Sequence, residues 1–257
     1  MPPPMPQPAT ATPTTESQDE VTRAWELCYL DPLAARDIGR RLAAGGGSIA
    51  VHGWLQVALA EVRIGDAAVA TTALAHARLG YAAQEDTAGL ALCDEVHAIL
   101  LRRNGDPESS ARLQLATDER GTLGTDPMSR FIAHNSRAIT AKQLGRVDES
   151  LHHFYAASEA ATATGWAGPR ITALGNLGGY HQELHNLEDA RQLCEQALRL
   201  AREAGARPMV ATSAANLIVI HHAAGEPEQA RAMAEFMLRH PEELMPNARE
   251  QHALYLA

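Results

Sequence analysis

A turn-like pair of residues recurs in this sequence at a constant interval of 40 residues, five times in succession. The pairs are Gly65-Asp66, Gly105-Asp106, Gly145-Arg146, His185-Asn186 and Gly225-Glu226. Each pair lies between two stretches with helical periodicity, and glycine ends four of the five preceding helices, as a left-handed C-terminal cap requires. One helical pair cannot bury both of its faces, whereas stacked copies can. The period therefore predicts a solenoid of helical pairs.

The expected first helices of the five pairs span residues 50–64, 88–104, 128–144, 170–184 and 208–224. The expected second helices span residues 66–79, 107–119, 147–162, 187–203 and 227–238. The close contact within each pair needs small side chains, and one column of the first helices is largely small. It reads Ala58, Ala98, Ala138, Gly178 and Ile218. Small residues at a fixed register let two helix backbones approach, which supports the pairing on packing grounds alone.

The composition favours an all-α protein and excludes several other classes. Aromatic residues make up 4% of the 257 residues, too few for a typical sandwich or barrel, while 49 alanines favour helices. The net charge of −9 lacks the basic footprint of a nucleic-acid binder. No apolar run is long enough for a membrane helix, and the N-terminus does not resemble a signal peptide. Three distant cysteines predict neither a disulfide framework nor a metal knuckle, so a cytoplasmic protein is expected.

These patterns divide the chain into four parts. Residues 1–20 are expected to be a disordered leader rich in proline and threonine. Residues 21–47 are expected to form an N-terminal capping hairpin of two helices. Residues 48–247 hold the five repeats, and residues 248–257 look like the first helix of an incomplete sixth repeat. Such an end would expose an apolar edge, so either the chain is cut from a longer protein or the edge packs on something, for which Leu254 and Tyr255 are the candidates.

The fourth repeat resembles the tetratricopeptide repeat. The resemblance rests on Asn176-Leu177-Gly178, Leu187-Glu188-Asp189-Ala190-Arg191 and Gln196-Ala197-Leu198-Arg199-Leu200-Ala201. Trp54 and Phe154 fall on the aromatic positions of the family, whereas His97 and Arg137 occupy a column that is normally apolar. The resemblance implies an all-α, right-handed superhelical solenoid of antiparallel helix pairs.

The period of 40 residues, rather than 34, resembles the long-linker subclass found in bacterial peptide-sensing regulators and signalling proteins. The hairpin containing Ala24-Trp25-Glu26-Leu27 and Asp31-Pro32, followed by long repeats, resembles the sensory half of bacterial diguanylate cyclases with a C-terminal GGDEF domain. The GGDEF sequence itself does not occur in this chain.

Motifs for catalysis are absent from the sequence. It contains neither a phosphate-binding P-loop nor a G-x-S-x-G elbow, so no catalytic residue, cofactor or metal is expected. His181 and His185 have the spacing of two zinc ligands, but Gln182 stands where a metalloprotease needs glutamate. The alignment of repeats favours a packing role for His181. The adjacent pairs His152-His153 and His221-His222 diverge on a helix.

The first helices of a tetratricopeptide array line its inner groove, and the family positions can be assigned in each repeat. Asn135, Asn176 and Asn216 fall on this inner side in three successive repeats, where amides can pair with an extended peptide backbone. Arg102 and Lys142 bring positive charge that suits a carboxylate or phosphate group. Gln182 and His222 continue that column, while Gly175 and Gly179 thin the groove wall.

The sequence therefore favours a non-catalytic module that binds a protein or peptide on its concave face, as the sensory or regulatory part of a bacterial signalling protein. Two alternatives stay open. One is self-association into a homodimer through the C-terminal helix. The other is a histidine-based metal-binding protein or enzyme. No nucleic acid or membrane partner is expected.

Overall fold

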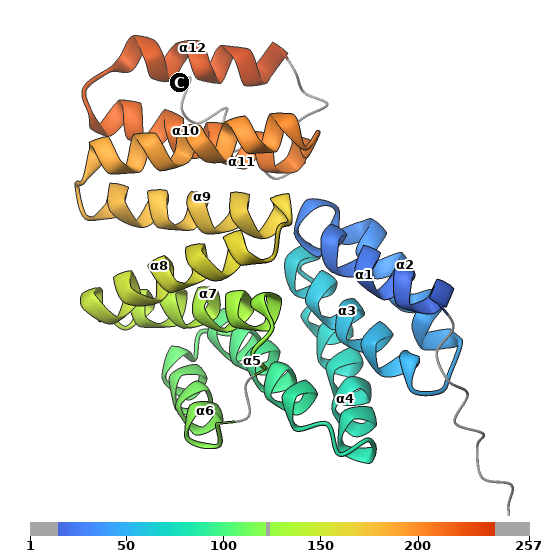
Figure 1. Cartoon of the computed structure of the whole chain (residues 1–257). Coiled ribbons are helices and arrows are strands. Elements are labelled where there is room, and N and C mark those ends of the chain that lie inside the picture. The colour runs from blue at the N-terminus through green and yellow to red at the C-terminus, as the bar shows by residue number, and fades with distance from the viewer. Residues whose placement is uncertain (1–14, 122–123, 240–257) are drawn as a thin grey trace, which may run out of the picture. The chain divides into compact units, whose positions relative to one another are not determined.

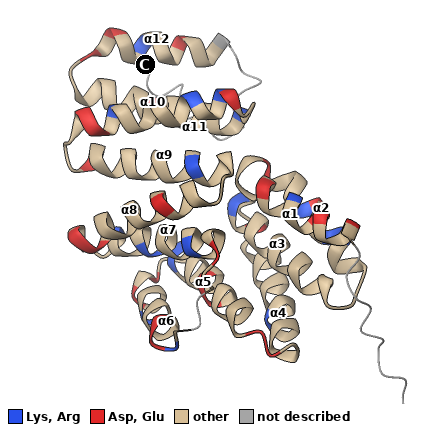
Figure 2. Ribbon diagram, in the orientation of Figure 1, with Lys and Arg blue, Asp and Glu red and all other residues tan. Residues whose placement is uncertain are grey.

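The computed structural model describes residues 15–121 and 124–239, and all regular structure in these ranges is α-helical (Figure 1). The chain forms two compact units, one ending at Thr125 and the other beginning at Asp126. None of the described helices is long and apolar enough to cross a membrane. Figure 2 shows charged residues of both signs in each unit.

The first unit contains six helices within the described residues. They are α1 (Thr15–Leu30), α2 (Pro32–Ala44), α3 (Ile49–Ile64), α4 (Ala67–Ala83), α5 (Thr87–Arg103) and α6 (Pro107–Glu119). Each helix packs against the next one in the chain, and α3 also contacts α1 and α5. The unit is therefore a stack of consecutive helical pairs.

The second unit repeats this arrangement with six more described helices. They are α7 (Pro127–Gln143), α8 (Val147–Ala163), α9 (Ala167–Glu183), α10 (Leu187–Glu203), α11 (Arg207–Ala223) and α12 (Pro227–Arg239). Again each helix packs on its successor, and α9 also contacts α7 and α11. The predicted all-α class, built from stacked helical pairs, is confirmed. The handedness of a superhelix and the division into a cap and five repeats stay predictions.

The turns explain why the pairs recur so regularly. Four of the five predicted turn positions hold a glycine with a left-handed backbone, for example Gly65 at φ 107° and Gly105 at φ 86°. His185 occupies the equivalent position at φ 61°, a conformation that is uncommon for a residue with a Cβ atom. The backbone therefore adopts one turn geometry in all five pairs, whichever residue stands there.

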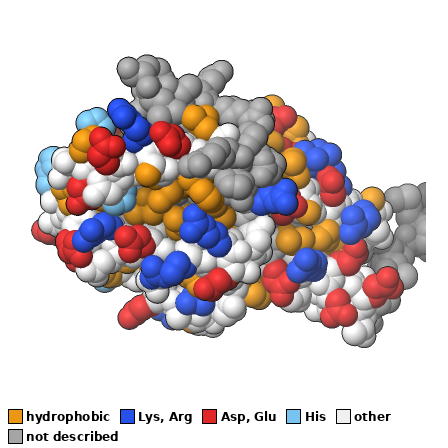
Figure 3. Space-filling model, turned by 90° about the horizontal axis from the view of Figure 1, so that it is seen from above, with side chains coloured by type: hydrophobic (Ala, Val, Ile, Leu, Met, Phe, Trp, Pro, Cys, Tyr) orange, Lys and Arg blue, Asp and Glu red, His pale blue; other side chains and the backbone are white. Residues whose placement is uncertain are grey.

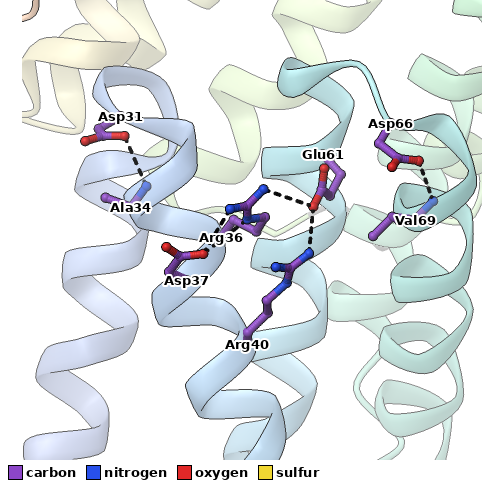
Figure 4. Close-up of polar contacts among 8 residues, drawn as sticks. All are labelled: Asp31, Ala34, Arg36, Asp37, Arg40, Glu61, Asp66 and Val69. Atoms are coloured by element: carbon purple, nitrogen blue, oxygen red, sulfur yellow. Dashed lines mark hydrogen bonds and ion pairs between the residues drawn. The ribbon is translucent and has the colours of Figure 1, made fainter.

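Aspartates fix the starts of several helices, and a buried ion pair fixes one contact between them. Asp31 and Asp66 each accept a hydrogen bond from a backbone N–H three residues later, at 3.0 Å (Figure 4).

The Glu61 carboxylate of α3 lies 3.2 Å from Arg40 and 3.8 Å from Arg36 of α2. Because Glu61 is only 2% exposed, these two arginines neutralise a charge that would otherwise be costly to bury.

The predicted leader is wrong over residues 15–20, because α1 begins at Thr15. The last proline of the leader is Pro13, so nothing in residues 15–20 interrupts a helix. Glu20 also forms an ion pair with Arg41 of α2 at 2.8 Å. Packing of α1 on α2 therefore extends the helix backward into a polar segment. Residues 1–14 and the predicted sixth-repeat helix, with Leu254 and Tyr255, lie outside the described residues.

The column of small residues lies where the helices of a pair meet. Ala58, Ala98 and Ala138 are fully buried, and Ala138 accepts a hydrogen bond from the Ser150 hydroxyl of α8 at 2.9 Å. At Gly178 of α9, an added Cβ atom would lie 2.6 Å from Cys194 Sγ and 3.2 Å from the Ala190 carbonyl oxygen. The backbones of α9 and α10 therefore approach more closely than a side chain at this position would allow.

The neighbouring glycine allows a matched test of this packing. We expect Gly178→Ala to lower the free energy of unfolding by about 1–3 kcal/mol, because it overpacks the contact with α10. Gly179→Ala should instead raise it by about 0.5–1 kcal/mol, since alanine favours a helix and its Cβ would meet nothing within 4 Å. Urea unfolding followed by circular dichroism measures both changes. Equal effects of the two substitutions would contradict the assigned packing.

Candidate functional site

In the second unit, the first helices of the three pairs are α7, α9 and α11, and each has one face that is only partly covered. These three faces lie next to one another, because α9 contacts both α7 and α11. We call this surface the inner face. Its residues recur at helical spacing and are half-buried or exposed, unlike the buried residues between them. They are Asn135, Ile139 and Lys142 on α7; Gly175, Asn176, Gly179 and Gln182 on α9; and Ala215, Asn216, Val219 and His222 on α11.

The three predicted asparagines bridge adjacent helices of the inner face. Asn176 Nδ2 donates to Asn135 Oδ1 at 2.8 Å, which links α9 to α7. Asn216 Nδ2 donates to the Gly175 carbonyl oxygen at 3.4 Å, which links α11 to α9. Each amide carries two N–H donors and an oxygen with two lone pairs. The Asn135–Asn176 bridge uses only part of the capacity of these two amides, whereas Asn216 also forms a hydrogen bond with Cys194. The asparagines therefore fix the helices relative to one another and keep donors and acceptors for a ligand.

The two bridges join residues that are 41 positions apart in the sequence, one more than the repeat length of 40. The ion pair between Lys142 and Glu183 has the same separation. Successive first helices are thus in contact at a register shifted by one residue. Residues 40 positions apart are equivalent in the repeat, but they are not the residues that contact each other across successive first helices.

The inner face has free space at Gly175 and Gly179 of α9, and we call these two residues the glycine floor. A Cβ atom added at Gly179 would meet nothing within 4 Å, and one at Gly175 would meet only Asn216 Nδ2 at 3.8 Å. Ile139 of α7 and Val219 of α11 are equivalent to Gly179 in the repeat and are half-buried. The face therefore combines a glycine floor, an apolar residue on each neighbouring helix and a row of amides.

The two predicted basic residues lie in different units. Lys142 belongs to the inner face, but its ammonium forms an ion pair with Glu183 at 2.5 Å, so its charge is already balanced. Arg102 lies on α5 of the first unit, where burial and then the charge of Arg103 lower its pKa to about 10. The structure therefore groups Lys142, Gln182 and His222 with the three asparagines, and it places Arg102 in a separate environment.

Burial dominates the chemistry of the titratable groups near the inner face. His181 is 5% exposed, and its Nε2 lies 3.0 Å from the Tyr155 hydroxyl, which confirms its packing role. Burial raises the pKa of Cys194 to about 11, and a hydrogen bond with Asn216 opposes that rise. Within residues 15–121 and 124–239, no group of three or more His, Cys, Asp or Glu side chains is arranged to hold a metal ion.

One histidine pair was not found from the sequence. His134 Nδ1 of α7 lies 3.1 Å from His153 Nδ1 of α8, and burial followed by the charge of His153 lowers the pKa of His134 to about 4. Arg137, Arg130 and His152 act in the same direction. Only the helix register brings residues 134 and 153 together, so their sequence spacing gave no signal.

This pair predicts a loss of stability in acid. The pKa of His134 in the folded chain is below its ordinary value of 6.5, so the unfolded chain binds the proton first as the pH falls. Stability is therefore complete above about pH 6.5 and decreases toward pH 4. We expect a contribution of roughly 1–2 kcal/mol, because water screens this half-exposed pair. Urea unfolding at several pH values measures it. An unchanged pH dependence in His134→Gln would contradict the assignment.

Comparisons with known proteins identify the repeat. Residues 169–235, which cover most of α9 through α12, match the model of the tetratricopeptide repeat. The predicted tetratricopeptide repeat is thereby confirmed for these residues, which include the motifs of the fourth repeat. The resemblance to the long-linker subclass and to the sensory half of diguanylate cyclases stays a prediction. None of the curated proteins matches the chain.

Two solved structures share the fold over most of the chain. BtubC (BKLC) from P. vanneervenii aligns with a TM-score of 0.60 at 20% identity, and 87% of each chain is covered. A Rap protein, solved in complex with Competence and Sporulation Factor, aligns with a TM-score of 0.64 at 11% identity. That alignment covers 94% of this chain and 67% of the Rap chain. At these identities the likeness establishes the fold alone.

Proposed function

We propose that this chain, which carries tetratricopeptide repeats, is a non-catalytic module that binds an extended peptide or protein segment on the inner face of its second unit. The observation that carries the proposal is the row of Asn135, Asn176 and Asn216, which crosses three adjacent helices above a glycine floor. Proteins with this repeat usually act as binding modules, and no catalytic family matches the chain.

The hydrogen bonds that hold the asparagines favour binding of an extended backbone. An extended segment presents alternating N–H and C=O groups, and an amide can donate to one and accept from the other. Asn176 is held by Asn135, and Asn216 is held by the Gly175 carbonyl, so a ligand does not have to order these side chains. Binding to a preorganised surface loses less conformational entropy, which favours affinity.

The glycine floor defines where a side chain of the ligand would lie. The space above Gly179 is open, and the neighbouring helices present Ile139 and Val219 at equivalent positions. An apolar ligand side chain placed there would bury its own surface and part of these two residues, at about 25 cal/mol per Å² of apolar area. Gln182, Lys142 and His222 lie toward the C-terminal ends of the same helices and would contact the polar part of the ligand.

The biological setting follows by analogy. The Rap structure contains Competence and Sporulation Factor, and its chain shares the fold over 94% of this one. Together with the long repeat period, this likeness supports a sensory or regulatory role in a bacterial signalling protein, with diguanylate cyclases as the model for its context. We accordingly propose a cytoplasmic protein without nucleic acid or membrane partners.

A substitution at the open glycine tests the proposal without removing a native contact. Peptides selected from a random display library against the whole chain provide the probe. Gly179→Gln should weaken their binding by roughly tenfold or more, because the new side chain fills the space for the ligand and displaces it. Its helix should be at least as stable as before. Isothermal titration calorimetry measures the affinity, and circular dichroism measures the thermal unfolding midpoint.

Ala163→Gln is the matched control, because it adds the same side chain at an exposed position of α8. Asn176→Ala combined with Asn216→Ala gives a second, independent perturbation. The proposal fails if the selected peptides bind Gly179→Gln and the asparagine double variant as tightly as the original chain. It also fails if the control weakens binding as much as Gly179→Gln.

Self-association is a second candidate, and one observation favours it. Leu238, near the end of α12, is 44% exposed, and residues 248–257 continue with further large apolar side chains. Homodimerisation through Leu254 and Tyr255 would cover such an apolar edge. We expect multi-angle light scattering to give a dimer mass for the full chain and a monomer mass for the double variant Leu254→Arg, Tyr255→Arg. A monomer mass for the unaltered chain at all concentrations would exclude this candidate.

A further inference from the structure

Asn135 and Asn176 of the inner face keep part of their hydrogen-bonding capacity for a ligand. Asn135 accepts a hydrogen bond from Asn176, and its own Nδ2 has no acceptor among the described residues. Asn176 donates one of its two N–H groups in this bond. Two N–H groups of Asn135 and one of Asn176 therefore remain on neighbouring helices. Such donors match a ligand that presents backbone carbonyl oxygens.

The charge of the inner face favours a ligand without charged side chains. Lys142 is the only Lys, Arg, Asp or Glu among the residues that define this face, and Glu183 balances it. Ile139 and Val219 of the face are apolar and half-buried, so a charged group placed beside them would lose hydration without gaining an opposite charge. An uncharged segment avoids this cost.

The spacing of the first helices favours one conformation of the ligand. Packed helices lie about 8–10 Å apart. A polyproline II helix repeats every three residues, which is about 9.3 Å, whereas a β-strand repeats every two residues, about 6.6 Å. A polyproline II segment that crosses α7, α9 and α11 therefore presents equivalent residues to all three helices. Its carbonyl groups make no internal hydrogen bonds, so they are available to the asparagine donors.

The chain itself contains a segment with the composition of such a ligand. Residues 1–14, which lie outside the described residues, include six prolines and no Asp, Glu, Lys, Arg or His. Proline-rich sequences favour polyproline II and lose little conformational entropy when they bind. At 3.1 Å per residue, fourteen residues extend about 43 Å. This length exceeds the roughly 20 Å that three neighbouring helices require.

From these observations we propose that residues 1–14 of a second copy of this chain bind across the inner face in the polyproline II conformation. The inference rests on the proposed function and names the ligand of that same site. Exchange between copies requires no particular path from residue 14 to α9 within one chain. The contact joins two molecules, so it depends on protein concentration.

The three-residue repeat also assigns the side chain that occupies the glycine floor. Pro2, Met5 and Pro8 lie on one edge of a polyproline II helix, because they are three residues apart. Met5 is the central residue of this edge, so it faces Gly179 of the central helix in either direction of binding. Its long, unbranched side chain adapts to the open space above Gly179, where an added Cβ atom would meet nothing within 4 Å.

A synthetic peptide of residues 1–14 tests this assignment when it is titrated into the whole chain by isothermal titration calorimetry. We expect saturable binding that Gly179→Gln in the chain weakens roughly tenfold or more, while Ala163→Gln leaves it unchanged. Within the peptide, Met5→Ala should weaken binding roughly tenfold. Met1→Ala is the matched control, because residue 1 lies on another edge of the helix, and it should have little effect. A peptide with alanine at all six proline positions should bind at least tenfold more weakly.

Sedimentation velocity tests the exchange between copies. The mass of the original chain should rise with concentration, that of Gly179→Gln should rise less, and an excess of the synthetic peptide should restore the monomer. The inference is overturned by a monomer mass at every concentration, or by a self-association that the peptide leaves intact. It is also overturned if Met5→Ala and Met1→Ala weaken binding equally, or if the alanine peptide binds as tightly.

This inference and the proposed function can fail separately. Peptides selected from a display library that bind the chain and lose affinity in Gly179→Gln support the proposed function. If the synthetic peptide of residues 1–14 does not bind the same chain, the inference about its own segment is overturned alone. If neither kind of peptide loses affinity in Gly179→Gln, both are overturned.

Discussion

The structure depends on the close approach of the two helices in each pair. Alanine or glycine stands at the contact in the first four repeats, and at Gly178 even one methyl group would collide with Cys194. This approach fixes which face of each first helix is buried against its partner. The opposite face of α9 then remains partly open, with Asn176, Gly179 and Gln182 at helical spacing. The surface that we assign to ligand binding is therefore a consequence of how tightly the pairs pack.

The contact between successive first helices determines how that surface is used. Its register of 41 residues brings Asn176 to Asn135 and Lys142 to Glu183. These contacts connect stability with function, because the same amides that join α7, α9 and α11 retain capacity for a ligand. They also balance the charge of Lys142, so we propose that the inner face recognises its ligand mainly through amides and shape. Figure 3 shows positive and negative side chains interspersed on one face of the molecule.

Much of the fold could be predicted from the sequence, because its signals are local and repeat. Turn glycines, the small column at Gly178 and the helical periodicity each reflect a constraint within one pair. Contacts between elements were harder to predict. The start of α1 at Thr15, the His134–His153 contact and the position of Arg103 at the end of α3 all depend on how two helices are rotated and shifted. A repeat of 40 residues locates equivalent residues, whereas neighbours across the stack follow from packing geometry.

Methyl NMR spectroscopy with a selected peptide tests the central claim most directly. Ile139 and Val219 carry methyl groups on the inner face, whereas Leu42 of α2 is buried with Ala24 and Ile38 in the first unit. The account predicts that saturating peptide shifts the methyl resonances of Ile139 and Val219 and leaves those of Leu42 nearly unchanged. Binding that shifts the Leu42 resonances while those of Ile139 and Val219 stay in place would contradict it.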